Sequence, residues 1–258
     1  MIGNRVPDPW QEERRESYYV SITDMLIGLL FLFIIMLMYF ALQLRTATQD
    51  LITSEDTRSE LLENIATYMR QNNIRAEVDL SAGVLRLPDE VLFEKGSDAP
   101  KAAGRAALQV LAGALSTNLP CYSYQTTPRP LVCGDLRHPV EAIFIEGHTD
   151  SDPITPSARI RDNWDLSASR AANTFRALVE YQPQLSTFLN APPNDQGSRP
   201  LLSVAGYADQ RPVDRGTDEA AMSHNRRIDV RFVMTTPKLS DAETPRTLAP
   251  IGPSRTGQ

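Results

Sequence analysis

The stretch DMLIGLLFLFIIMLMYFAL, residues 24–42, is the most apolar run of the chain and has the length of a bilayer crossing. It begins with one carboxylate, Asp24, and continues through residues 25–42 without another charge. A helix of about 20 apolar residues spans the hydrocarbon core. The run is longer than the roughly 7 to 15 residues of a signal-peptide core, and no A-x-A-like cleavage site follows it. We therefore expect a retained transmembrane helix over residues 19–44.

Asp24 is the candidate proton-carrying residue of this helix. A carboxylate against such a run costs roughly 2.5 to 3.5 kcal/mol on insertion scales, and intramembrane acids normally face a watery or protein-lined path. Ser17, Ser21, Asp24 and Gly28 recur at helical spacing and share one face, which we interpret as the pore-lining face. The alternative is that Asp24 only caps the helix at the membrane interface.

The two cysteines indicate the side of the membrane on which the remaining chain lies. Cys121 and Cys133 bracket a polar loop, a spacing that favours a disulfide, although a reduced pair is the alternative. A disulfide implies an oxidising compartment. The sequence therefore predicts a single-pass membrane protein with a cytoplasmic N-terminus and with the residues after about 45 outside the cytoplasm.

Composition bounds the partners and the domain organisation. The 258 residues carry a net charge of −6, so we expect no nucleic-acid partner. Hydrophobic periodicity and proline content divide the chain into five blocks. These are a cytoplasmic arm (1–18), the transmembrane helix (19–44), an amphipathic linker helix (45–73), one folded domain (74–234) and a disordered tail (235–258).

Within the folded domain, helices and strands alternate. The segments AEVDL (76–80) and VLRL (84–87) predict a hairpin, and residues 102–119 a helix. Two β-rich runs that end in glycine, AIFIEG (142–147) and LLSVAG (201–206), flank a strong helical pattern around residues 168–179. A last strand alternates as Ile228, Val230 and Phe232. This order predicts an α/β sandwich with helices packed on a mixed β-sheet.

Four phrases in this order resemble the OmpA-like peptidoglycan-binding domain in the form found in MotB-type flagellar stators. They are LFEKGSDAP (92–100), IFIEGHTDSDPI (143–154), RDNWDLSASRAANTFRAL (161–178) and VAGYADQRPVD (204–214) followed by HNRRIDVRF (224–232). A single N-terminal span with an aspartate and a linker helix fits the same group. Within it, the entry YYVSITDMLIG (18–28) and the charge-mixed arm look most like the ZorB subunits of the Zorya anti-phage defence system.

The resemblance implies a binding site for meso-diaminopimelate, the zwitterionic amino acid of the peptidoglycan stem. Asp150 would take its ammonium group and Arg170 its carboxylate, while Asn163 would line the same pocket. Arg226 or Arg227 would supply a second basic contact, and the resemblance does not distinguish between them.

The resemblance implies a place in the bacterial inner membrane, with a periplasmic C-terminal domain, and it also implies a motor. Two copies would stand inside a ring of a multi-span, ZorA-like subunit, Asp24 would be protonated and released in turn, and the anchored domains would hold the dimer still. A flagellar stator subunit is the first alternative, and a passive peptidoglycan tether is the second.

Enzymatic activity, cofactors and metals are not expected. The chain has three histidines and contains neither a G-x-S-x-G nor an H-E-x-x-H motif nor a phosphate-binding glycine loop. His148, Asp150 and Asp152 could suggest a metal site, but no second ligand cluster at suitable spacing completes it.

Overall fold

The computed structural model describes residues 9–136, 138–157 and 159–235, with side chains from residue 18 onward. The chain divides into two units, residues 1–50 and 51–258, and each is considered by itself. Residues 1–8 of the predicted arm and 236–258 of the predicted tail lie outside the described part.

The first helix, α1 (Pro9–Gln71), contains the apolar run of the first unit and also enters the second. It is the one helix in the described chain that is long and apolar enough to cross a membrane, and none of its most apolar window is buried. The sequence predicted separate transmembrane and linker helices, whereas α1 is continuous through both ranges. Its last turns are core, since Leu61, Leu62, Ile65 and Met69 are fully buried. The compact second unit begins at residue 51 and so includes the last turns of α1.

The second unit is built on a five-stranded mixed sheet with the order β1-β2-β5-β3-β4. The predicted hairpin is β1 (Glu77–Asp79) and β2 (Val84–Pro88), and β2 pairs antiparallel with β5 (Arg227–Met234). On the other side of the central strand β5, β3 (Val140–His148) pairs antiparallel with β5 and parallel with β4 (Leu202–Gly206). The parallel pair requires a crossover, which contains α4 (Asn163–Tyr181).

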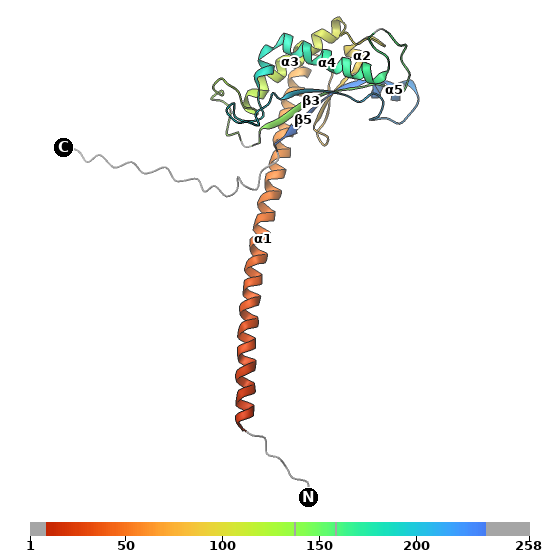
Figure 1. Cartoon of the computed structure of the whole chain (residues 1–258). Helices are drawn as coiled ribbons and strands as arrows, with labels where there is room; N and C mark the ends of the chain where they lie inside the picture. Colours follow the sequence, from red (N-terminus) through yellow and green to blue (C-terminus); the bar gives the residue numbers. More distant parts are fainter. Residues whose placement is uncertain (1–8, 137, 158, 236–258) are drawn as a thin grey trace, which may run out of the picture. The chain divides into compact units, whose positions relative to one another are not determined.

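Helices cover one face of this sheet, as Figure 1 shows for α3 (Ala102–Asn118) and α4. Their apolar stripes join the alternate strand residues Ile143, Ile145, Ile228, Val230 and Phe232 in one core. Short elements complete the unit: α2 (Asp89–Leu92), η1 (Leu119–Cys121), η2 (Pro183–Thr187) and α5 (Glu219–Asn225). The predicted α/β domain with helices on a mixed sheet is confirmed.

Two glycines bring α4 close to the ends of β3 and β4. A Cβ on Gly147 would lie 2.0 Å from the carbonyl oxygen of Ser167, and one on Gly206 would lie 2.6 Å from the amide nitrogen of Ala168. Real Cβ atoms do not approach so closely, so only glycine permits this packing. As a result, the first half of α4 lies against the strand end that precedes Asp150.

Cys121 and Cys133 form a disulfide, with their Cα atoms 5.1 Å apart, as the sequence predicts. The bridge closes the loop that leads from η1 toward β3. It therefore holds together a polar segment that lacks regular secondary structure over its described residues.

The disulfide generates the first prediction. Replacing both cysteines by serine should lower the free energy of unfolding by about 3 kcal/mol, because a loop of this length loses that much closure entropy in the unfolded state. Denaturant unfolding of the full chain in detergent measures the loss. Two free thiols, found by mass spectrometry in protein prepared without reductant, would contradict the bridge itself.

Candidate functional site

The site centres on the sheet edge where β3 ends and β5 begins. His148 faces Arg227 across the antiparallel ladder, so the residues just outside this pair, Asp150 and Arg226, meet at one edge. Arg226 Nη1 donates to Asp150 Oδ2 at 2.7 Å, and Nη2 donates to Glu219 Oε1 at 2.6 Å. Asp150 is buried, whereas 16% of the Arg226 side chain is exposed. The edge therefore presents a guanidinium held between two carboxylates.

Arg170 lies in the interior behind this edge, with only 2% of its side chain exposed. Its Nη1 lies 3.0 Å from Asp89 Oδ2, Nε donates to the Ser97 carbonyl at 2.8 Å, and Nη2 donates to the Glu94 carbonyl at 3.2 Å. The guanidinium also lies over the Phe93 ring, 5.0 Å from its centroid. The sequence analysis expected the Arg170 guanidinium to bind a ligand carboxylate. In the structure this guanidinium is bound by groups of its own domain.

Asp89 is the partner that the sequence analysis did not identify. Burial raises its pKa to about 6, and this effect exceeds the opposing attraction of Arg170. Burial likewise lowers the pKa of Arg170, against the attraction of Asp89 and Asp150. The domain therefore keeps a carboxylate and a guanidinium together in its interior. Burial disfavours the charged form of each group, and the charge of its partner favours it.

Asn163, the first residue of α4, fastens the loop that follows β3. Its Nδ2 donates to the carbonyl oxygens of Asp150 at 3.2 Å and Asp152 at 2.9 Å. Its Oδ1 is buried and accepts no hydrogen bond within the described chain. Asp162 caps α4 by accepting from the Asp165 amide, which fixes Asn163 at the helix start. Asn163 thus orients the backbone around Asp150 and has an acceptor left over.

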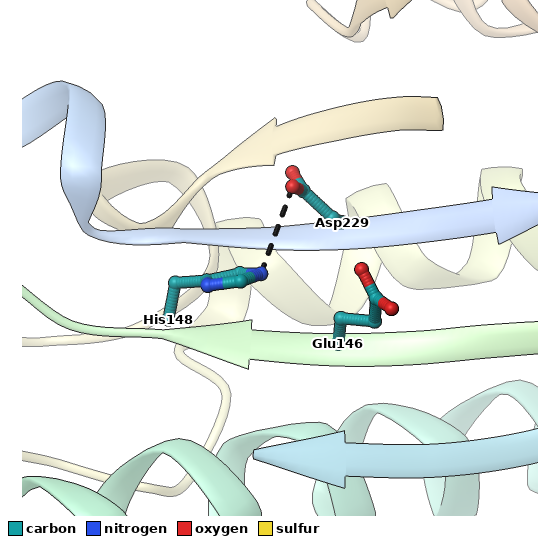
Figure 2. A group of neighbouring side chains, drawn as sticks. All are labelled: Glu146, His148 and Asp229. Carbon is teal, nitrogen blue, oxygen red and sulfur yellow. Dashed lines mark ion pairs between the residues drawn. The ribbon is translucent and has the colours of Figure 1, made fainter. Parts of the chain in front are cut away.

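Arg227 points to the other face of the sheet, since neighbouring strand residues alternate in direction. It is 4% exposed, and its Nε donates to Asp229 Oδ2 at 3.0 Å. Of the two candidate arginines, Arg226 is therefore the one against Asp150. The remaining groups on the Arg227 face are Glu146, His148 and Asp229, drawn in Figure 2.

These three side chains lie within 4.8 Å of one another, a spacing that a metal ion could use. Their charges are nevertheless already compensated. Arg231 donates to both oxygens of Glu146, and Asp229 accepts from Arg86 and Arg227. With three guanidinium groups against two carboxylates, a further cation would be repelled. We interpret the group as a salt-bridge network that fills this face of the sheet.

His148 is the uncompensated member of the network. It is 2% exposed, stacks on Tyr207 with ring centroids 5.4 Å apart, and neither ring nitrogen has a hydrogen-bond partner in the described structure. Nε2 lies 3.7 Å from Asp229 Oδ2, too far for a good hydrogen bond. Burial and the neighbouring arginines lower its pKa to about 3. The imidazole is therefore neutral at physiological pH.

The predicted membrane residues all lie on α1. Ser21, Asp24 and Gly28 are exposed, and a Cβ on Gly28 would have no neighbour within 4 Å in the described chain. Ser17 lies in the part of α1 whose side chains the structure does not describe. The role of these residues therefore depends on what surrounds the helix.

No protein-family model matches the chain. It is 28% identical over 189 residues to the uncharacterized protein YtxE of Bacillus subtilis strain 168, covering 72% of this chain and 64% of YtxE. It is 33% identical over 93 residues to Motility protein B of the same strain, covering 36% and 30% of the two proteins. The matches thus span less than two thirds of either relative.

Two solved structures show the extent of the structural likeness. A MotB-like protein from Desulfovibrio vulgaris aligns with a TM-score of 0.49 at 23% identity, over 70% of this chain and 94% of that one. The periplasmic domain of Helicobacter pylori MotB (residues 90–256) aligns with a TM-score of 0.42 at 21% identity, over 62% and 78%. The fold assignment itself rests on the strands and helices described above.

The second prediction concerns His148. The unfolded chain binds a proton at the ordinary imidazole pKa of 6.5, while the folded chain does so only near 3. Between these values the unfolded state holds more protons at this residue, so the stability that His148 contributes falls as pH decreases from 6.5 toward 3, by an amount on the order of a few kcal/mol. The raised pKa of Asp89 acts in the opposite direction below about pH 6, so the effect is read from the difference between variant and unmodified chain. His148→Gln should flatten this acid loss.

Denaturant unfolding of the full chain in detergent at pH 7.5, 5.5 and 4.5 measures the effect. His224→Gln is the control, because His224 is exposed on α5 and should leave the acid loss in place. Parallel pH profiles for His148→Gln and the unmodified chain would contradict the assignment.

Proposed function

We propose that the chain is a peptidoglycan-anchored inner-membrane subunit of a proton-driven, stator-type motor that acts in Zorya anti-phage defence. The observation that carries the anchor is the charge arrangement at the sheet edge. Asp150, Arg226 and Glu219 alternate in sign there, and the Arg170–Asp89 pair lies behind them. An arrangement of positive and negative side chains suits a zwitterionic ligand, which carries charges of both signs.

The zwitterionic end of diaminopimelate is such a ligand. Asp150 Oδ2 accepts from Arg226, and its other oxygen accepts from the Asp152 amide. A carboxylate has about four acceptor positions, so an ammonium can still be bound. The exposed part of Arg226 would then receive the ligand carboxylate, a charge-assisted contact that contributes roughly 1.5 to 3 kcal/mol, and Arg170 would add its positive charge from the interior behind it.

Two further observations support the motor part of the proposal. The chain is similar in sequence to Motility protein B over 93 residues, and α1 carries Asp24 at the start of its apolar run. In the proposed mechanism, protonation of Asp24 removes its charge and lets the helix move within a surrounding ring of a multi-span, ZorA-like subunit. Ionisation of Asp24 holds the helix in place again. Two copies anchored to peptidoglycan provide the fixed point against which the ring moves.

The same observations support a flagellar stator subunit as the second candidate, because Motility protein B is named for motility. The Zorya assignment rests on the entry to the span and on the charge-mixed arm. A passive tether explains the domain but gives no reason for a carboxylate at the membrane run.

The third prediction tests the anchor. Asp150→Ala should reduce co-sedimentation of the full chain with purified peptidoglycan at least several-fold, because it removes the partner of the ligand ammonium. The fold should persist, since Arg226 keeps its pair with Glu219. Arg176→Ala is the control, because Arg176 lies exposed on α4 and its guanidinium donates to Asn173 of the same helix. Normal pelleting of Asp150→Ala would refute the anchor.

Arg170→Ala is a poorer test of the same idea. It would leave Asp89 charged and unpaired in the interior, which costs about 3 to 5 kcal/mol, so loss of binding would not be separable from loss of fold.

The fourth prediction tests the motor. Asp24→Asn keeps the shape and neutrality of a protonated carboxyl group but cannot release a proton, so assembly with the multi-span subunit should persist while phage protection is lost. Co-purification and plaque counts measure the two outcomes, and a swimming assay separates defence from motility. Undiminished protection by an assembled Asp24→Asn variant would revive the tether.

A further inference from the structure

A cleft of about 970 Å³ lies in the second unit, and Arg226, the partner of Asp150, is one of its lining residues. Its walls come from the end of α1 and the residues after it, from the β1–β2 hairpin, from α2 and from the segment that includes α5. All of these residues belong to the same unit. The cleft is large enough for several amino-acid residues of a peptide, since ligand pockets commonly measure about 300 to 1,000 Å³.

The cleft is lined by five arginines but only three acids, Glu77, Glu90 and Asp214. The arginines are Arg70, Arg75, Arg86, Arg226 and Arg227. An arginine-rich wall of this kind favours oxyanions, because the guanidinium fork matches a carboxylate or a phosphate.

Three of the five arginines are already paired. Arg86 and Arg227 pair with Asp229, and Arg226 pairs with Asp150 and Glu219. The other two, Arg70 and Arg75, are exposed and form no ion pair with any residue in the described part of the chain. Arg70 bonds only neutral groups, the Ala66 carbonyl and the Thr67 hydroxyl. The last turn of α1 and the segment after it thus bring two positive charges without an ion-pair partner in the described chain to the lining of a cleft, in a protein of net negative charge.

Arg226 joins this cleft to the sheet edge, since it lines the cleft and donates to Asp150. We propose that the cleft binds the free carboxylates of a peptidoglycan stem peptide whose diaminopimelate end lies at Asp150, with Arg70 and Arg75 as the contacts. The inference rests on the proposed anchoring function and extends it. Apolar residues between the arginines, including Ile74, Val91 and Val213, would pack against the aliphatic parts of the peptide.

The proposed site predicts that the chain distinguishes a stem peptide with a free carboxylate from the same peptide with that carboxylate amidated. In L-Ala-γ-D-Glu-meso-diaminopimelate, the residue next to diaminopimelate carries a free α-carboxylate, and amidation removes its charge without changing its size. The full chain in detergent should bind the free acid about tenfold more tightly than the amide, the equivalent of one charge-assisted contact. Isothermal titration calorimetry with both synthetic peptides measures the ratio.

The fifth prediction is that Arg70→Gln/Arg75→Gln abolishes this ratio while retaining affinity for the amidated peptide. The control is Arg176→Gln/Arg215→Gln, which removes two exposed charges outside the cleft and should keep the ratio. Equal affinity of the unmodified chain for both peptides overturns the proposal. So does a control variant that loses the ratio as the cleft variant does.

Asp150→Ala separates failure of the cleft from failure of the anchor. If only the cleft inference is wrong, Asp150→Ala weakens binding of both peptides and the cleft variant weakens neither. If the anchor is wrong, Asp150→Ala binds the amidated peptide as tightly as the unmodified chain does.

Discussion

The buried ion pair between Arg170 and Asp89 is the interaction on which the rest of the candidate site depends. A guanidinium that is 2% exposed must have its charge and its N–H groups satisfied, because an unpaired buried charge is strongly destabilising. Arg170 meets this requirement with one carboxylate from α2 and two carbonyls from the loop after it. One α4 side chain therefore fixes two segments that are more than seventy residues earlier in the sequence. The loop and α2 have their positions because a charge must be neutralised there.

Strand alternation then decides which charges stay available. Arg226 and Arg227 are neighbours, and an extended chain directs them to opposite sides. Arg227 enters a closed network with Asp229, whereas Arg226 remains partly exposed between Asp150 and Glu219. The sheet thus separates a structural set of charges from a set that a ligand can reach. Arginines and carboxylates make up both sets, and the set that a ligand can reach includes the more exposed arginine, Arg226.

The sequence predicted the elements better than it predicted their contacts. Period-two and helical patterns are local, so the strands at β2, β3, β4 and β5 and the helices α3 and α4 could be located from residues alone. The continuity of α1 was missed, because the change from apolar to charged composition at residue 45 suggested a boundary that the backbone does not have. No proline or glycine interrupts residues 45–71, so the residues that most often end a helix are missing from this range.

The site shows the same limit. Asp150, Asn163 and Arg226 lie together, whereas the pairing of Arg170 with Asp89 spans 81 positions and depends on tertiary packing. No local pattern marks Asp89, which follows a strand and begins a four-residue helix. The sequence did contain one indirect signal. Periodicity places Arg170 near the buried stripe of α4, and a buried arginine requires a carboxylate partner elsewhere in the chain.

Asp24 and Asp89 illustrate how the surroundings of one residue type determine its role. Asp89 is compensated within its own domain, so its charge contributes to structure. Asp24 forms no ion pair with any residue in the described part of α1, and it lies at the start of an apolar run, where a carboxylate costs roughly 2.5 to 3.5 kcal/mol. The described helix supplies no compensating charge for it. If the run is in a bilayer, the compensation must come from a second copy, from another subunit or from a bound proton, and each of these makes the membrane segment part of an assembly whose state depends on protonation.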